Sequence, residues 1–382
     1  MAPGKDRLSE LGDDLLCYEI LSKLPLRDAV RSSILSTRWR LLWRKIPHLH
    51  FSYEFYHCFS DLVICSHMGN YWDCADIIDN VFQQHSAPLT SCKFHPWICC
   101  TRYTEKIEEW IERIRVKGVK EIVIISGYTP PVEDPSKEAS YSIPTNLFAC
   151  QTLTALELGY FGLTGTPESC LGFPCLVSCS LHFIVASNEK NELQDFIALC
   201  PQLQNLRLSK CLVFNNLKIG AQHLKYLKLK YCTFKTFIVD CPRLVNLEEI
   251  DCEFGALEKD HYYSGLSSFK VSSPTSLCDV NVSDFCLLER LSAAKTITKI
   301  SIGICKLQCA SGFLNMLANF PNLERLTLNE CMIESRNMET VKEMGIASDI
   351  NFPNLKEVVI DFLCMTSGNE VAMLNFLVVF TY

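Results

Sequence analysis

Apolar residues in the segment 8–51 recur every three or four positions, which is the spacing of amphipathic helices. Three short helices are predicted there. Asp13 or Asp14 is expected to cap the first helix, which carries leucine and isoleucine along one side. This helix should end at Leu24, because Pro25 blocks its continuation.

The second and third helices follow directly. The second is predicted to begin at about Leu26, and Ser36 or Thr37 is predicted to start the third. The apolar positions of the three helices are Leu15, Leu16, Ile20, Leu21 and Leu24, then Ala29, Val30 and Ile34, then Trp39, Leu42, Trp43 and Ile46. A module of ~40 residues buries too little of its chain to be secure alone, so we expect a partner to cover part of this surface.

A second pattern, LxxLxLxxC, repeats through the middle of the chain. It fits LQNLRLSKC, LKYLKLKYC, ITKISIGIC and LERLTLNEC, which begin at Leu203, Leu224, Ile297 and Leu323. LVNLEEIDC, from Leu244, fits with Glu249 in place of the third apolar residue. Copies without the final cysteine begin at Leu89, Val119, Leu153, Leu176 and Leu277, and a short extra copy, LSSFKVSSP from Leu266, is not placed by the pattern.

The spacing of these copies predicts a leucine-rich-repeat solenoid, which is an α/β fold. Successive copies from Leu153 to Leu244 begin 20 to 27 residues apart. In each copy a short strand should point alternate side chains inward and pair in parallel with the strand of the next copy. Five copies follow a proline, which should end the helical return of the repeat before: Pro174, Pro201, Pro242, Pro321 and Pro353.

The last position of the frame calls for a small side chain inside the coil. A free buried cysteine behaves as a small apolar residue with a weak hydrogen-bond donor. Five cysteines occupy this position: Cys211, Cys232, Cys252, Cys305 and Cys331. We therefore expect these thiols to be structural rather than reactive.

Four domains are expected along the chain. The helical module occupies residues 8–51, and 52–118 is an irregular linker with N-terminal capping repeats. Within residues 52–118, the segments that begin at Asp73 and Thr104 are predicted to form amphipathic helices. Regular repeats fill 119–340, and 352–382 forms a separate C-terminal segment.

The apolar content, the length of apolar runs and the net charge limit the classes of protein to which this chain can belong. The chain has 382 residues, of which 48% are apolar, so disorder is not expected. No segment resembles a signal peptide, and no run approaches the ~20 apolar residues of a membrane span, so an intracellular soluble protein is expected. The net charge of −7 disfavours nucleic acid as a partner, because a phosphate-tracking groove needs the opposite sign.

Cysteine and histidine, the residues that commonly bind metals or act as nucleophiles and bases, are present, but their spacing matches no metal site or catalytic motif. Without a secretory signal, the 22 cysteines are expected to stay reduced. Loose metal or nucleophile candidates are Cys175 with Cys179, Cys305 with Cys309, Cys58 with Cys65 and His67, Cys92 with His95, and Cys99 with Cys100. None has a second ligand pair at zinc-finger spacing or a group placed to activate a thiol. We expect no catalytic residue, metal site or cofactor.

The helical module resembles the F-box of plants. The matching runs are LGDDLL, EILSKLP, RDAV, SILSTRWRLLW and IPHLHF, in order and without gaps. One departure is Gly12, where the family usually has proline. The resemblance implies docking on the Skp-type adaptor of cullin-based ubiquitin ligases. The residues expected to bind the adaptor are Leu11, Leu15, Ile20, Leu24, Pro25, Val30, Trp39, Leu42 and Trp43.

The resemblance implies a substrate receptor rather than an enzyme. The F-box would bind the adaptor, and through it cullin, the repeats would bind an unknown target protein, and other subunits would transfer ubiquitin in the cytoplasm or nucleus. The alternative is a non-degradative leucine-rich-repeat scaffold that binds a partner protein or a small hormone-like ligand. Repeat proteins present their strand face for recognition. The exposed positions expected on that face are Gln204, Asn205, Arg207, Lys225, Tyr226, Lys228, Glu324 and Arg325.

The end of the chain, from Phe352, is similar to the opening of the FBD domain that follows such repeats in many plant F-box proteins. The resemblance implies a strand, a turn, and a helix led by Glu370. Because the sequence stops at Tyr382 within this apolar segment, the FBD-like unit is expected to be incomplete, with poor solubility of the chain alone.

Overall fold

The structure is a computed structural model of the whole chain. It describes Leu8, Leu288, Leu291 and residues 10–52, 74–94, 104–125, 141–163, 170–186, 192–211, 214–250, 252–254, 268–271, 276–282, 294–303, 306–307, 310–333 and 352–362. The chain divides into two compact units, Met1–Val185 and Ala186–Tyr382, here called unit 1 and unit 2.

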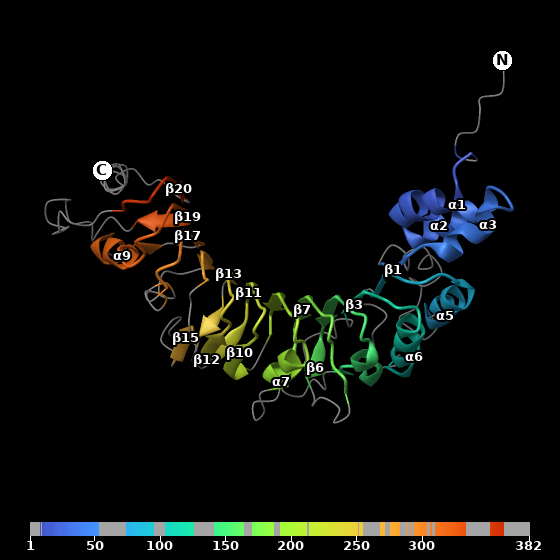
Figure 1. Cartoon of the computed structure of the whole chain (residues 1–382), viewed down its shortest axis with the longest axis horizontal. Helices are drawn as coiled ribbons and strands as arrows, with labels where there is room; N and C mark the ends of the chain where they lie inside the picture. The colour runs from blue at the N-terminus through green and yellow to red at the C-terminus, as the bar shows by residue number, and fades with distance from the viewer. Residues whose placement is uncertain are drawn as a thin grey trace, which may run out of the picture. The chain divides into compact units, whose positions relative to one another are not determined.

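Unit 1 begins with the predicted helices (Figure 1). The first is a continuous helical stretch made of α1 (Asp13–Leu15), the π-helix η1 (Leu16–Ile20) and the 3-10 helix η2 (Leu21–Lys23). The second is α2 (Leu26–Arg31) with η3 (Ser32–Ile34), and the third is α3 (Trp39–Leu42) with η4 (Trp43–Lys45). The chain is extended at Leu24 before Pro25, as predicted.

The predicted cap of the first helix is wrong. Gly12 is the N-cap residue, and no side chain caps this helix end. Asp13 lies inside the helix and pairs with Arg38 instead. Ser36 does serve the start of the third helix, because its Oγ accepts the Trp39 backbone N–H at 3.3 Å.

The parallel sheet of unit 1 starts inside the helical module. Its strands are β1 (His48–Phe51), β2 (Ser91–Phe94), β3 (Glu121–Ile125), β5 (Ala155–Gly159) and β7 (Ser178–His182), each paired in parallel with the next. Between each pair of neighbouring strands, one backbone carbonyl just before the first strand accepts hydrogen bonds from two successive backbone N–H groups at the start of the next strand. The first of these carbonyls belongs to Pro47, which accepts from Thr90 and Ser91 at 2.8 and 3.2 Å. The module and the repeats therefore share one hydrogen-bonded sheet.

Two helices pack beside the first strands, as the sequence predicts. They are α5 (Cys74–Gln84) and α6 (Thr104–Arg115). Phe94 lies at the centre of their core, with ring centroids 5.4 Å from Phe51 and 5.7 Å from Trp110. The Trp110 indole N–H donates to Asp79 at 2.8 Å, which joins α6 to α5. Further along unit 1, η7 (Thr145–Ala149) precedes β5, and β4 (Tyr141–Ser142) pairs with β6 (Phe161–Leu163).

Unit 2 continues the same frame. Its strands are β9 (Asn205–Ser209), β11 (Tyr226–Lys230), β13 (Asn246–Ile250), β16 (Asp279–Val282), β17 (Lys299–Ile302), β19 (Arg325–Ile333) and β20 (Glu357–Phe362), again all parallel. The three leading apolar residues are buried in the copies that begin at Leu203, Leu224, Leu277, Ile297 and Leu323, for example Leu224, Leu227 and Leu229. The predicted repeat fold is thereby confirmed. The first strand of the FBD-like segment, β20, is simply added to the repeat sheet.

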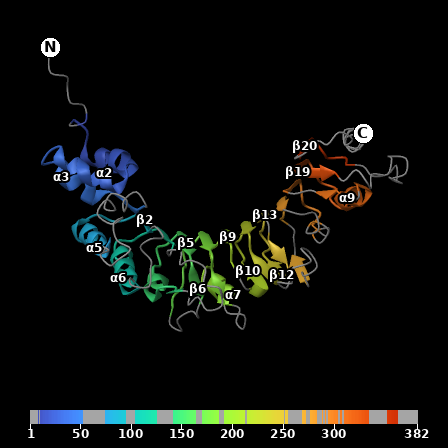
Figure 2. The same cartoon turned by 180° about the vertical axis from the view of Figure 1, so that it is seen from behind.

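The return segments of unit 2 are partly strands rather than helices. Strands β10 (Phe214–Gly220) and β12 (Thr233–Asp240) pair in parallel and lie side by side in both views (Figures 1 and 2). Strand β15 (Ser268–Val271) also pairs with β12, and β14 (Glu253–Phe254) adds to it. Residues 268–271 of the extra copy LSSFKVSSP thus form a return strand, which is why this copy begins only eleven residues before the next one. Helical returns occur at α7 (Glu192–Ala198) and α9 (Ala310–Leu317).

The five prolines act in a tight turn rather than only as helix ends. In each copy the first frame residue donates its N–H to the residue before the proline, as Leu203 does to Cys200 at 3.1 Å and Leu244 to Cys241 at 3.1 Å. Proline then occupies the second position of a β-turn, where its fixed φ is favoured. Pro242 follows strand β12, so the prediction of a helix before it is wrong.

Candidate functional site

The core of the F-box-like module consists of apolar residues from all three helices. Trp39, which is 7% exposed, packs there with the other buried residues of the module. These are Leu16, Cys17, Leu21, Leu26, Ala29, Leu42, Trp43 and Ile46. Trp39, Leu42 and Trp43, three of the residues predicted to bind the adaptor, are thus buried in the core of the module rather than exposed on its surface.

A second set of large apolar side chains on the same module faces solvent. Ile34 is 86% exposed and Leu35 is 65% exposed. The others are Leu8, Leu15, Tyr18, Leu24 and Leu41, and we call these seven residues the exposed apolar set. In the whole described part of the chain only four other large apolar residues are as exposed. Single exposed apolar residues are ordinary, but seven on one small module indicate an interaction surface.

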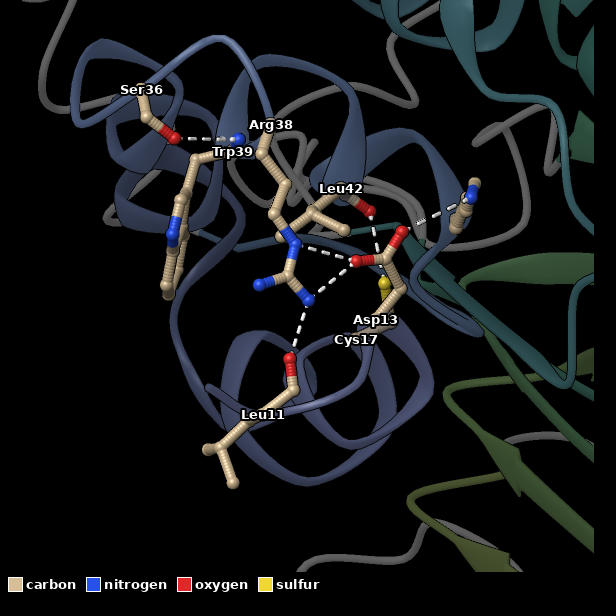
Figure 3. Close-up of polar contacts among 8 residues, drawn as sticks. Leu11, Asp13, Cys17, Ser36, Arg38, Trp39 and Leu42 are labelled. Carbon is tan, nitrogen blue, oxygen red and sulfur yellow. Dashed lines mark hydrogen bonds and ion pairs between the residues drawn. The ribbon is translucent and has the colours of Figure 1, made fainter. Parts of the chain in front are cut away.

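Arg38 joins the start of the first helix to the start of the third (Figure 3). Its Nε and Nη2 donate to one carboxylate oxygen of Asp13 at 2.8 and 2.7 Å, and Nη2 also donates to the Leu11 carbonyl. The Cys17 thiol, on the same side, donates to the Leu42 carbonyl at 3.4 Å. These contacts fix the first helix relative to the third, and these two helices carry Leu15, Tyr18 and Leu41 of the exposed apolar set.

The module is also bonded to α5. His85, buried at the end of that helix, lies with Nε2 2.8 Å from the Ile46 carbonyl oxygen. The backbone N–H of Ser86 donates to the Arg44 carbonyl at 2.9 Å, and the Arg44 guanidinium donates to Gln84 at 3.0 Å. Burial lowers the pKa of His85, so the imidazole is held neutral with Nε2–H as the donor.

The other predicted adaptor-binding residues lie at or near the surface. Leu15, Leu24 and Pro25 are exposed, and Leu11, Ile20 and Val30 are half-buried. Ile34 and Leu35 are exposed although they were not among the residues predicted to bind the adaptor. Helical spacing gave no signal for this, because adjacent apolar residues of a short helix can both be buried, as Leu42 and Trp43 are.

The strand face of unit 2 forms the second candidate surface. Strands β9, β11 and β13 are in register, so their outward residues form three rows. The rows are Asn205–Tyr226–Asn246, Arg207–Lys228–Glu248 and Ser209–Lys230–Ile250. We call these nine residues the strand-face grid. Their side chains point away from the buried leucines that alternate with them along each strand.

A polar network runs across the middle of the grid. Lys228 Nζ lies 2.7 Å from one carboxylate oxygen of Glu248, and the Tyr226 hydroxyl donates to the other. The Arg207 guanidinium lies over the Tyr226 ring, 5.6 Å from its centroid. Burial and the bond to Glu248 raise the pKa of Tyr226 to about 12. Although burial alone would raise the pKa of Glu248, the bonds from Lys228 and Tyr226 hold it below its usual value.

The predicted target-binding residues are thus distributed over two places. Arg207, Tyr226 and Lys228 meet in the network, Asn205 stands beside them, and Gln204 and Lys225 precede the strands. Glu324 and Arg325 lie on another part of the sheet, where they pair with Lys356 at 3.0 Å and Glu357 at 2.6 Å. Glu248, which completes the network, was not among the predicted residues.

Unit 1 has a smaller polar cluster on its strand face. His48 Nδ1 and His50 Nε2 lie 3.0 and 3.2 Å from the Ser91 hydroxyl. Lys93 pairs with Glu121 at 2.9 Å. Burial lowers the pKa of both histidines, and Lys93 adds to this at His50. Two residues of the F-box-like module therefore form the edge of the repeat face.

Only some of the cysteines and histidines considered as metal or nucleophile candidates are among the described residues. Burial raises the pKa of the Cys92 thiol, which opposes a nucleophilic role. Of the pair four residues apart, Cys179 is buried and Cys175 is exposed. Among the residues that the structure describes, no group of three or more His, Cys, Asp or Glu side chains is placed to hold a metal ion. His95, Cys99, Cys100, Cys58, Cys65, His67 and Cys309 lie outside the described residues.

Comparison with known proteins gives two family matches. Residues 8–51 match the F-box domain, and residues 107–257 match the LRR repeats described for the FBD-associated F-box protein At5g56370. This chain carries an F-box followed by leucine-rich repeats. The F-box match ends at Phe51, so its last four residues are the strand β1 that opens the repeat sheet.

Similar proteins are found in Arabidopsis thaliana. The F-box/FBD/LRR-repeat protein At1g13570 is 29% identical over 247 residues, which cover 64% of this chain and 54% of that protein. The putative F-box/FBD/LRR-repeat protein At2g05300 is 27% identical, covering 60% and 45%, and the putative FBD-associated F-box protein At5g53635 is 25% identical, covering 95% and 82%. This chain spans about half the length of the first two relatives.

A solved leucine-rich-repeat protein of Leptospira interrogans aligns at 12% identity with a TM-score of 0.19, covering 72% of this chain and 90% of that one. In the described part of the chain, no helix has the length and apolar character needed to cross a bilayer.

Proposed function

We propose that this protein is the substrate-recognition subunit of a cullin-based ubiquitin ligase of the SCF type. The F-box would dock on a Skp-type adaptor, and the repeats would hold the target protein. The contribution to the reaction is proximity, because ubiquitin is transferred by other subunits and this chain makes no bond. Such a receptor would work in the cytoplasm, the nucleus or both.

The exposed apolar set carries the proposal. The F-box already has a closed core of its own, so the seven outward apolar residues are not needed to fold it. Anchors of this kind dominate interfaces, and truncating one costs about 2 kcal/mol or more. The surface includes Leu15 and Leu24 with their neighbour Pro25, three of the residues predicted from sequence.

Continuity between F-box and repeats supports the delivery role. Strand β1 belongs to the F-box and pairs with β2 of the first repeat, and Pro47 and Ile46 accept hydrogen bonds from the repeat side. An F-box tied in this way transmits its position to the first strands of the repeats, so a target bound there would be held at a fixed place relative to the adaptor.

Co-purification with adaptor and cullin tests the proposal. The full chain should retain both, and Ile34→Ser with Leu35→Ser, or Leu24→Ala with Pro25→Ala, should lose both while the repeats stay folded. The matched control is Val116→Ser with Leu171→Ser, which changes two exposed apolar residues outside the F-box and should leave adaptor binding intact. A wild-type chain that captures neither protein would favour the non-degradative scaffold, and F-box variants that bind normally would remove the exposed apolar set from the interface.

A further inference from the structure

One stretch of unit 2 has a charge opposite to that of the whole chain. Between Asp195 and Asp240 there are seven Lys or Arg residues and no Asp or Glu, whereas the complete chain has a formal net charge of −7. Five of these seven cations lie on strands β9 and β11 or directly beside them: Arg207, Lys210, Lys225, Lys228 and Lys230. We call these five residues the basic patch.

Strand register brings the cations together instead of separating them. Arg207 is the direct partner of Lys228 across the two strands, which stand ~4.8 Å apart. Like charges directly opposite each other are destabilising. Glu248, on the next strand, offsets one of them through Lys228. One carboxylate is thus built into the edge of an otherwise cationic surface.

Two cations of the basic patch, Lys210 and Lys230, lie at the ends of these strands. Lys210 and Tyr231 follow β9 and β11 with φ of 52° and 53°, and the Lys210 N–H donates to the Lys230 carbonyl at 2.7 Å. This left-handed turn places two ammonium groups around one aromatic ring: Lys230 Nζ is 4.9 Å and Lys210 Nζ is 5.8 Å from the centroid of the exposed Tyr231. The ring attracts both cations and holds them near the surface of the patch.

We propose that the basic patch binds an acidic, carboxylate-rich segment of the target protein. The inference rests on the proposed function only in calling the occupant a target. Lys225, directly before β11, and Lys230, the last residue of β11, are five residues apart, so about six extended residues of a bound segment would cover the patch. The planar Arg207 guanidinium, oriented by the Tyr226 ring, suits bidentate contact with a carboxylate.

An acidic peptide fits the surface better than nucleic acid does. A nucleic-acid strand needs cations along an extended track, and here the next strand presents Glu248 and the following one Asp279 in the row of Tyr226. The surface charge therefore changes from positive on β9 and β11 to negative on β13 and β16. A short acidic segment matches a cationic area of that limited width.

Fluorescence anisotropy with the full chain tests this inference. The probe is a labelled peptide of about twelve residues that alternates glutamate and glycine, long enough to cover the patch in extended form. It should bind, and binding should weaken as salt rises from about 50 to about 300 mM, because exposed charges are screened. The same peptide with glutamine should not bind.

Charge reversal locates the site. Lys225→Glu with Lys230→Glu should reduce affinity about tenfold or more, since two attractive contacts become repulsive. The matched control is Lys120→Glu with Lys218→Glu: both lysines are exposed, Lys120 also precedes a repeat strand, and Lys218 lies on return strand β10. The control changes net charge equally and should alter affinity less than about twofold.

Three results would overturn the inference: no binding of the glutamate peptide at low salt, equal losses in the two double variants, or tighter binding of a thymidine oligonucleotide of the same length. Adaptor co-purification, measured on the same preparations, keeps the proposals separate. Loss of peptide binding with intact adaptor binding removes only the basic patch, and peptide binding without adaptor binding removes only the ligase assignment.

Discussion

The imidazole of His85 lies with Nε2 2.8 Å from the carbonyl oxygen of Ile46, and this contact joins the first repeat helix to the end of the F-box. The other ring nitrogen, Nδ1, is buried without a hydrogen-bond partner in the structure. Protonation would put a charge on that buried nitrogen, next to Lys117, whose Nζ donates to the His85 carbonyl at 2.9 Å. The junction is therefore expected to be sensitive to acid.

The sign follows from the lowered pKa of His85. Between that value and the ordinary ~6.5, the unfolded chain binds more protons than the folded one. The free energy of unfolding of the junction should thus be unaffected above ~6.5 and should fall as the pH drops below it, until the lowered pKa is reached. His48 and His50 shift in the same direction and add to the effect.

Hydrogen exchange of the F-box amides at about pH 7.5 and about pH 5.5, corrected for intrinsic exchange rates, measures this loss. Gln at position 85 can keep an N–H donor for Ile46 without titrating, so His85→Gln should show a smaller acid-induced loss. His223→Gln changes a histidine of unit 2 and should behave like wild type. An equal acid response in His85→Gln would exclude His85 as the titrating group.

Gly12 offers a stabilising substitution. It is the N-cap of the first helix with φ −66°, a value that proline adopts, and a Cβ built there meets no atom within 4 Å. Gly12→Pro, which restores the residue usual in plant F-boxes, should raise the free energy of unfolding of the F-box by about 0.4–1 kcal/mol by restricting the unfolded chain. Gly12→Ala should give part of this gain. A destabilised proline variant would mean that Leu11 cannot adopt the extended conformation needed before proline.

The sequence predicts the repeats well because each inward position obeys a strict rule. Leu203, Leu206 and Leu208 are buried as the frame requires, and the copies of the frame contain the strands from β2 to β17 that form the sheet. Strand β1 lies outside the frame and was not predicted. The returns were harder to predict, since short segments such as that containing Leu217 and Ile219 alternate with a period of two and become strand β10 rather than a helix.

The candidate surfaces were less predictable than the fold. Helical spacing identified Trp39 and Trp43 as apolar positions but could not decide whether a ring faces the core or a partner, because both need the same periodicity. The network on the strand face depends on register between β11 and β13. Glu248 becomes the partner of Lys228 only once that register is known.

The frame cysteines should be protected from alkylation. Cys211 and Cys232 are buried, and each thiol donates to the carbonyl two residues before it, at 3.6 and 3.4 Å. Quantitative mass spectrometry after brief treatment with N-ethylmaleimide should find both unlabelled in the native chain and labelled after denaturation. Exposed Cys175 is the internal control and should react at once. Cys305 and Cys331, whose side chains lie outside the described residues, are predicted to follow Cys211. Rapid native labelling of all four would contradict their position inside the coils.

Glu249 breaks the apolar frame and is nevertheless only 2% exposed. Its Oε1 accepts the backbone N–H of Cys252 at 2.7 Å, so the carboxylate satisfies a backbone group where the chain turns after β13. Glutamine keeps an acceptor oxygen in the same place and removes the cost of burying a charge. Methionine has a similar length but only a weak acceptor.

Glu249→Gln should therefore be at least as stable as wild type in urea unfolding, and Glu249→Met should be less stable than Glu249→Gln by about 1 kcal/mol or more, because the Cys252 N–H loses its partner. The comparison between the two variants isolates the acceptor, since size and charge are nearly matched. Tyr226→Phe, on the neighbouring strand, also removes one hydrogen bond to a glutamate but at the partly exposed Glu248, so its effect should be smaller. If methionine proved as stable as glutamine, Glu249 would be tolerated in the core for its packing alone and the bond to Cys252 would contribute nothing to stability.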